Sequence, residues 1–123
     1  MGKFILWLSA AAFISYGLAC FFMPGLAASY AGLEMTSGDA FSEIGAMYGG
    51  LQTGFGIFCA MGATREGFYR PALTALMVVI GLLAVGRLYS TITGPGDVGF
   101  YTWGAMAYEF FTAIVAGLAL RKS

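Results

Sequence analysis

Four apolar segments dominate this sequence, and each is long enough to cross a lipid bilayer. They run over residues 4–22, 43–61, 71–92 and 100–120. A transmembrane helix needs roughly 20 mostly apolar residues, because the hydrocarbon layer is about 30 Å thick. Backbone polar groups must be paired inside that layer, so segments of this length are expected to be helices. We therefore expect an all-α integral membrane protein.

The composition fits a lipid environment and argues against several classes of function. Hydrophobic residues make up 59% of the chain and charged residues 10%, whereas an average soluble domain has about 25% charged residues. The basic and acidic residues cancel, and a protein without a basic excess is not expected to bind nucleic acid. The sequence has no histidine, which is the commonest acid–base group and metal ligand. We expect no metal, no cofactor and no catalysis.

Breaks between the segments predict a single domain over residues 1–123. Gly94-Pro95-Gly96 separates the last two segments, and such a run breaks a helix. We expect Pro71 in the first turn of the third helix and Ser42 as the N-cap of the second. The first connection, over residues 23–42, is long, but the other two are short, so neighbouring helices should be antiparallel in an up-down-up-down four-helix bundle.

The basic side chains predict how the chain is oriented in the membrane. Lys3 precedes the first segment, Arg65 and Arg70 lie between the second and third, and Arg121 and Lys122 follow the fourth. With four spans these three regions lie on one side, and the other two connections carry acidic but no basic residues. Basic residues accumulate on the cytoplasmic side. We therefore expect both termini in the cytoplasm.

Small residues recur at the spacing used for close helix packing. A small residue at every fourth position lets two helix backbones approach each other in a membrane. The second segment has two such stripes, one formed by Gly45 and Gly49 and the other by Ala46, Gly50 and Gly54, and the fourth has a shorter one, Ala113 and Gly117. These faces serve either packing inside the bundle or contact with a second protein. We favour internal packing, with the second helix touching more than one neighbour.

Three ionisable residues fall in the outer half of the expected bilayer. At 1.5 Å per residue, Arg87 is ~7 Å and Glu109 ~13 Å from the outer end of its helix. An unpaired charge near the bilayer centre costs roughly 2.5–3.5 kcal/mol, so we expect these two side chains to face each other. Glu43 opens the second segment on the same side, and Arg87 would bridge the depth between the two glutamates.

Polar side chains near this pair permit two interpretations. Tyr48 and Gln52 are one turn apart on one helix face, and Tyr108 precedes Glu109, so all three can supply hydrogen bonds. One interpretation is a structural clamp that fixes how the helices dock. The other is a polar pocket, open to the outer side, for a headgroup, a quinone or a small ion, because ionisable residues inside a membrane are functional by default.

The motifs around these residues resemble those of a known family. "EIGAMYGGLQTGFGIF" (43–58), "GRLYS" (86–90) and the lone glutamate in "YEFFTAIVAGLALR" (108–121) are similar to a bacterial family of small four-helix membrane proteins, the domain of unknown function four-three-four-five. The resemblance maps its motif onto Tyr48, Gly49, Gly50, Gly86, Arg87 and Glu109. The chain departs from it at Gly45-Ala46, where a basic residue often stands. A more distant similarity to DoxX-type proteins, some of which accompany membrane redox systems, implies a fold and no assigned activity.

We therefore predict a non-catalytic membrane protein that is an accessory or interaction subunit of a larger membrane assembly. Glycine-faced helices favour this role, since they are suited to close contact with other helices. Its partners would be the lipid bilayer and other membrane subunits or a second copy of itself. The resemblance to a bacterial family implies the bacterial inner membrane as its location. The alternative is a binder or transporter of a small molecule, lipid or quinone that uses a pocket around Arg87 and Glu109.

Overall fold

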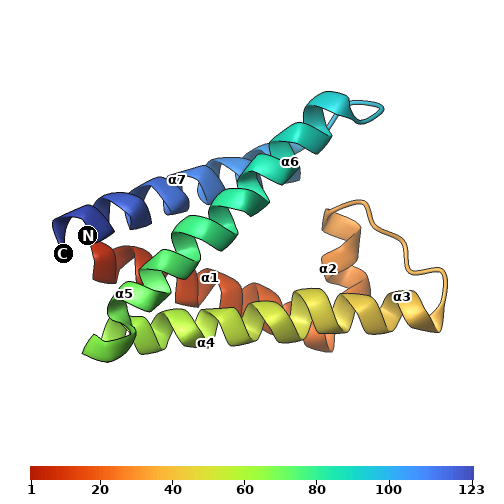
Figure 1. Cartoon of the computed structure of the whole chain (residues 1–123). Coiled ribbons are helices and arrows are strands. Elements are labelled where there is room, and N and C mark those ends of the chain that lie inside the picture. Colours follow the sequence, from red (N-terminus) through yellow and green to blue (C-terminus); the bar gives the residue numbers. More distant parts are fainter.

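The structure is a computed structural model that describes residues 1–123, except for the side chains of residues 26 and 27. Its described elements are all helical (Figure 1). They are α1 (Gly2–Phe22), α2 (Pro24–Tyr30), α3 (Gly38–Glu43), η1 (Ile44–Gly50), α4 (Leu51–Thr64), α5 (Glu66–Ala75), η2 (Leu76–Ile80), α6 (Gly81–Thr93) and α7 (Phe100–Lys122). η1 and η2 are π-helical stretches inside longer helices, so α3–η1–α4 forms one helix over 38–64 and α5–η2–α6 another over 66–93.

Three helices are long and apolar enough to cross a membrane. They are Gly2–Phe22, Glu66–Thr93 and Phe100–Lys122. The helix over 38–64 is of comparable length, but its glycines, Tyr48 and Gln52 make it less apolar. Large apolar side chains are exposed along the helices, as expected for surfaces that face lipid rather than water.

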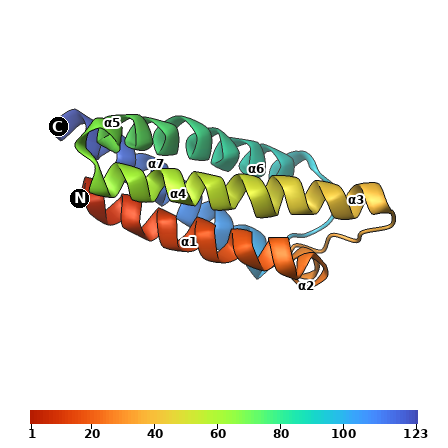
Figure 2. The same ribbon diagram turned by 90° about the horizontal axis from the view of Figure 1, so that it is seen from below.

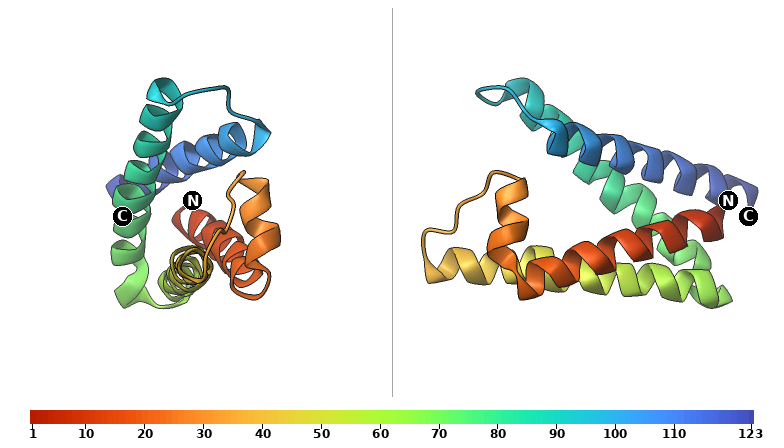
Figure 3. Two further views of the ribbon diagram at one scale, coloured as in Figure 1. Left: turned by 90° about the vertical axis from the view of Figure 1, so that its right-hand side faces the viewer. Right: turned by 180° about the vertical axis from the view of Figure 1, so that it is seen from behind.

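The long helices form two pairs that meet at one end of the molecule and diverge at the other (Figures 1 and 3). α1 packs along η1 and α4, while η2 and α6 pack against α7. Both termini lie at the end where the pairs meet, beside the turn between α4 and α5 (Figure 2). The hydrophobic core is concentrated at this end, around Ile5, Leu6, Leu73 and Leu76.

Glycines set the distance between α1 and the helix over 38–64. A Cβ added at Gly17 would lie 2.6 Å from the backbone nitrogen of Thr53, and one at Gly49 would lie 3.0 Å from Cα of Phe21. Neither distance leaves room for a side chain. The two backbones are therefore in direct contact, as expected for small residues at a helix interface in a membrane.

Other glycines of the same helix do not pack against a neighbour. Gly45 and Gly54 face open space where a Cβ would be, and Gly50 would meet only the carbonyl of Gly45 on its own helix. Ala46, Gly50 and Gly54 are all exposed. Of the predicted face formed by Gly45 and Gly49, only Gly49 thus packs on α1, and the stripe of Ala46, Gly50 and Gly54 stays uncovered.

Small residues also line the contact between α7 and the helix over 66–93. A Cβ at Gly81 would lie 3.6 Å from Cβ of Ala113, and one at Gly117 would lie 3.4 Å from Sδ of Met77. These are van der Waals distances to side chains. Ala113 and Gly117 therefore allow side chains to pack between the helices, without the backbone contact seen at Gly17.

The predicted start of the third helix is wrong. α5 begins at Glu66, directly after Arg65, whose backbone is extended with φ −127° and ψ 124°. Pro71 consequently lies inside α5 rather than in its first turn. A proline removes one intrahelical hydrogen bond. The other backbone hydrogen bonds of the helix are retained, because unpaired backbone groups are costly in lipid.

The predicted start of the second helix is also wrong. α3 begins at Gly38, and the Ser37 hydroxyl accepts a hydrogen bond from the backbone nitrogen of Ala40 at 3.1 Å. Ser37 has the extended backbone that an N-cap requires, with φ −156° and ψ 168°. Ser42 is already inside α3 and cannot take that role.

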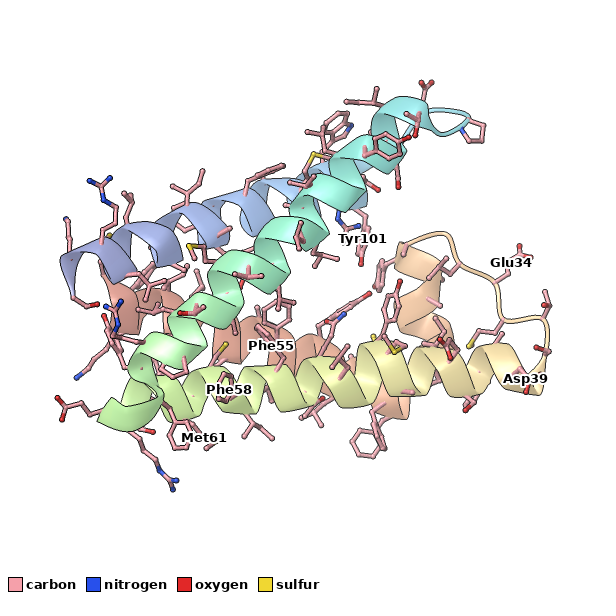
Figure 4. All side chains as sticks on the ribbon, in the orientation of Figure 1. Glu34, Asp39, Phe55, Phe58, Met61 and Tyr101 are labelled. Carbon is pink, nitrogen blue, oxygen red and sulfur yellow. The ribbon has the colours of Figure 1, made fainter. Side chains whose placement is uncertain are left out.

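Charged side chains are segregated along the molecule. Glu34 and Asp39 lie at the end away from the termini (Figure 4). At the other end, Arg70 donates hydrogen bonds to the carbonyl of Leu120, at 3.2 Å, and to the hydroxyl of Ser123. A basic side chain at a helix C-terminus satisfies carbonyls that have no partner in the helix, so Arg70 fastens the end of α7 to α5.

Candidate functional site: an ion pair beside a cavity

Arg87 of α6 and Glu109 of α7 form an ion pair with two parallel hydrogen bonds. Nε of Arg87 donates to Oε1 of Glu109, and Nη2 donates to Oε2, both at 2.8 Å. The Glu109 side chain is 7% exposed and that of Arg87 26%. Charge-assisted bonds in this fork geometry are the strongest that arginine makes to a carboxylate. The pair therefore fixes α6 against α7 at a set depth.

Glu43 does not join this pair. Its side chain is exposed at the end of α3 and does not line the space around Arg87. The helix over 38–64 and α6 diverge toward this end of the molecule (Figure 1). Similar depth in the membrane therefore does not bring Glu43 to Arg87, and the expected bridge between two glutamates is not formed.

The ion pair forms part of the wall of a cavity of about 820 Å³. The cavity lies between α1, the helix over 38–64, α6 and α7, and residues 31 and 33 border it at the divergent end. The other polar side chains in its wall are Tyr16, Tyr48, Gln52, Tyr101, Thr102 and Tyr108. Sites for small molecules and cofactors span about 300–1,000 Å³, so this cavity has the size of a ligand site.

Hydrogen bonds between α1 and α7 close one side of the cavity. The hydroxyls of Tyr16 and Tyr101 are 3.1 Å apart, and Tyr108 donates to the hydroxyl of Ser9 at 3.0 Å. Both contacts join residues that lie far apart in the sequence. They hold the first and last helices together.

Two polar side chains of the helix over 38–64, Tyr48 and Gln52, line the cavity. Tyr48 lies in η1 and Gln52 at the start of α4, one turn further on. Neither side chain hydrogen-bonds to any residue that the structure describes, and Nη1 of Arg87 likewise has no acceptor there. Partly buried polar groups normally have a partner, so this wall can bind a polar ligand or water. A π-helical stretch such as η1 is frequent at functional sites.

Apart from Tyr48 and Tyr108, the aromatic residues of the cavity were not predicted from the sequence as part of the site. Phe13 of α1 packs edge-to-face on Phe55, with ring centroids 5.3 Å apart, and on Tyr108, at 6.3 Å. Tyr101 hydrogen-bonds to Tyr16 in the cavity wall, and Figure 4 shows Phe55 and Tyr101 between the two helix pairs. Helical spacing carries part of this signal, because residues 101 and 108 are two turns apart and so lie on one face of the last helix.

Apolar helices of membrane length, an interior ion pair and an adjacent cavity define a helical protein of membrane character. The chain belongs to the family described as Domain of unknown function (DUF4345), which matches residues 1–120. The match includes α1 and so extends beyond the motif-bearing region from Glu43 onward. No curated protein and no solved structure matches the chain.

Proposed function

We propose that this chain is a multi-pass protein of the bacterial inner membrane, with four spans in an up-down-up-down bundle. The length of the helix over 38–64 supports a fourth span beside the three more apolar helices. Lys3, Arg65 and Arg121 belong to the end of the molecule where both termini lie, so the distribution of basic residues favours cytoplasmic termini. A distant relation to DoxX-type proteins is part of the same proposal.

Within that membrane, we infer that the protein binds a small membrane-soluble molecule and has no catalytic activity of its own. The observation that carries this inference is the cavity beside the Arg87–Glu109 pair, lined by Tyr48 and Gln52, which have no hydrogen-bond partner among the described residues. A structural clamp requires the ion pair alone, and protein interiors are otherwise packed without large voids. Binding, followed by transfer or presentation of the ligand, accounts for both the pair and the cavity.

A second candidate function is that of an accessory subunit docked on a larger membrane assembly or on a second copy of the chain. The exposed stripe of Ala46, Gly50 and Gly54 favours it, because such stripes allow close helix contact in a membrane. This stripe and the cavity occupy different faces, so the two functions are compatible. A ligand site explains why Tyr48, Gln52 and Nη1 of Arg87 have no hydrogen-bond partner among the described residues, and the subunit role does not.

Gentle detergent extraction followed by mass spectrometry separates these functions. A small amphiphile retained at about one molecule per chain, and lost from an Arg87→Met/Glu109→Leu variant, supports binding in the cavity. A larger protein that co-migrates at fixed stoichiometry with both forms supports the subunit role. A native protein that carries no small molecule and binds none from added membrane lipids contradicts the binding function.

A further inference from the structure

One side of the cavity is bordered by apolar residues that are themselves exposed. Met47 and Leu51 of the helix over 38–64 and Leu82 and Leu83 of α6 line the cavity, and between 42% and 66% of each is exposed. α4 and α6 are not packed along each other, and they separate on the side that faces the viewer in Figure 1. In a membrane, the exposed apolar side chains at this border of the cavity would face the hydrocarbon layer rather than water.

The polar wall of the cavity carries no net charge. Arg87 and Glu109 are its charged side chains and cancel each other, while Tyr48 and Gln52 are neutral. A charged headgroup entering this space would lose its hydration and meet no free counter-charge, which is costly at low dielectric. Nη1 of Arg87 offers only donor hydrogens, and Tyr48 and Gln52 can donate as well. The site therefore suits uncharged groups that accept hydrogen bonds.

We propose that the cavity takes an amphiphile dissolved in the membrane, with an uncharged head that carries acceptor oxygens, and that this ligand enters sideways between the helix over 38–64 and α6. The proposal rests on the binding function above and names its ligand class. The head lies against Arg87, Tyr48 and Gln52, and the apolar tail leaves through the gap between Leu51 and Leu83. The head can be a flat ring, which would stack on Phe13 and Phe55 in the cavity wall, or a simple hydroxyl, which would bind to the polar side chains alone.

The ligand class is tested with probes that share a decyl chain and differ in the head. Binding to purified protein in nanodiscs of zwitterionic lipid is measured by tryptophan and tyrosine fluorescence for decyl-benzoquinone, decanol, decyl phosphate and decyltrimethylammonium. We expect at least one uncharged probe to bind about tenfold or more tightly than either charged probe, a difference of about 1.4 kcal/mol. The quinone and the alcohol distinguish a ring head from a hydroxyl head.

Two outcomes overturn the proposal in different ways. Tightest binding by the phosphate or the ammonium probe contradicts the uncharged head, yet leaves the cavity as a binding site. If no probe binds and the protein retains no small molecule on purification, the binding function itself is wrong. These results therefore separate an error in the ligand class from an error in the function.

Charge variants test the same idea from the protein side. Glu109→Gln leaves Arg87 without a counter-charge. Gln52→Lys adds a positive charge and keeps the ion pair, so the test can still be made with one variant if the other folds poorly. Each should shift preference about tenfold toward decyl phosphate. Gln52→Leu is the matched control, since it removes polarity without adding charge and should weaken binding of the uncharged probe alone. An unchanged preference in both charge variants is inconsistent with a neutral site.

The sideways route is tested by narrowing the gap. Leu51→Trp together with Leu83→Trp should slow association of the uncharged probe about tenfold or more in stopped-flow measurements. Leu118→Trp is the control, because Leu118 is exposed on α7 and does not line the cavity. Equal association rates in the double variant and the control would show that the ligand reaches the cavity by another route.

Discussion

At the scale of single residues, the Arg87–Glu109 pair is the main electrostatic interaction in the interior of this protein. Its two 2.8 Å hydrogen bonds satisfy both carboxylate oxygens of a side chain that is 7% exposed. Neither charge is tolerated alone at this depth without a cost of roughly 2.5–3.5 kcal/mol. Arg87 is the more exposed member and has a long side chain that can extend toward the membrane surface, whereas Glu109 has no such freedom.

This asymmetry predicts unequal effects of removing the two partners. Arg87→Met should lower the free energy of unfolding by about 3 kcal/mol, because Glu109 is left buried and unpaired. Glu109→Leu should cost less, about 1–2 kcal/mol, since Arg87 can extend outward. The double variant Arg87→Met/Glu109→Leu should recover most of the loss, as paired charges and apolar replacements differ little in stability. Unfolding in mixed micelles measures all three.

The control is Arg65→Met, which removes an exposed arginine at the α4–α5 turn and should change stability by less than about 0.5 kcal/mol. A double variant that is no more stable than Arg87→Met would contradict the pairing. Equal losses in the two single variants would contradict the argument from side-chain length.

The sequence was sufficient to predict that Arg87 and Glu109 face each other. Two opposite charges on adjacent antiparallel helices at similar depth avoid the free-energy cost of an unpaired buried charge only when they pair with each other. It was not sufficient to place Glu43. Depth is a property of position along one helix, whereas the distance from Glu43 to Arg87 depends on the angle between two helix pairs. That angle is set by packing at the far end, around Leu6 and Leu73, and no local pattern encodes it.

At the scale of helices, glycine has two different environments in one element. Gly49 is in backbone contact with α1, while Gly54, five residues further on, faces open space. The sequence identified both stripes by spacing but could not say which one packs. The helix starts were also misjudged, since Ser37 and Ser42 are equally good caps by type and only the extended backbone of Ser37 distinguishes them.

These environments predict opposite responses to the same substitution. Gly17→Ala places a methyl group 2.6 Å from the backbone nitrogen of Thr53, where no flexible side chain can yield, and should destabilise by about 1–3 kcal/mol. Gly54→Ala meets open space and should be neutral or stabilise by up to about 1 kcal/mol through helix propensity. Thermal unfolding in detergent compares the two. A Gly54→Ala variant as unstable as Gly17→Ala would show that the uncovered stripe is a contact surface in solution.

At the scale of the whole molecule, two helix pairs converge on a hydrophobic core at the end that holds both termini and diverge at the other (Figure 3). Outside the Arg87–Glu109 pair, the basic residues belong to the converged end, and Glu34 and Asp39 lie at the divergent one (Figure 4). The sequence predicted the helices and this separation of charge, because both follow from local composition. It did not predict the divergence, and hence the cavity, since these depend on which side chains fill the space between the pairs.

The proposed orientation predicts which ends are accessible from outside the cell. In a chain with Cys20 and Cys59 replaced by alanine, an Asp97→Cys variant should react with a membrane-impermeant maleimide in intact spheroplasts. A Gly67→Cys variant should react only after the membrane is permeabilised, because the α4–α5 turn lies with the termini, on the side that we propose to be cytoplasmic. Labelling in the reverse pattern would invert the topology, and labelling of both in intact spheroplasts would exclude four spans.

Whether the ion pair belongs to a binding site is decided most directly by the affinity of decyl-benzoquinone or decanol, whichever binds the native protein more tightly. This affinity is compared between the native protein and the Arg87→Met/Glu109→Leu variant, in nanodiscs, after both are shown to have similar unfolding transitions. We expect the folded variant to bind at least about tenfold more weakly, because the head loses the Nη1 donor of Arg87. Equal affinity would contradict the account, since the pair would then serve only to hold α6 against α7.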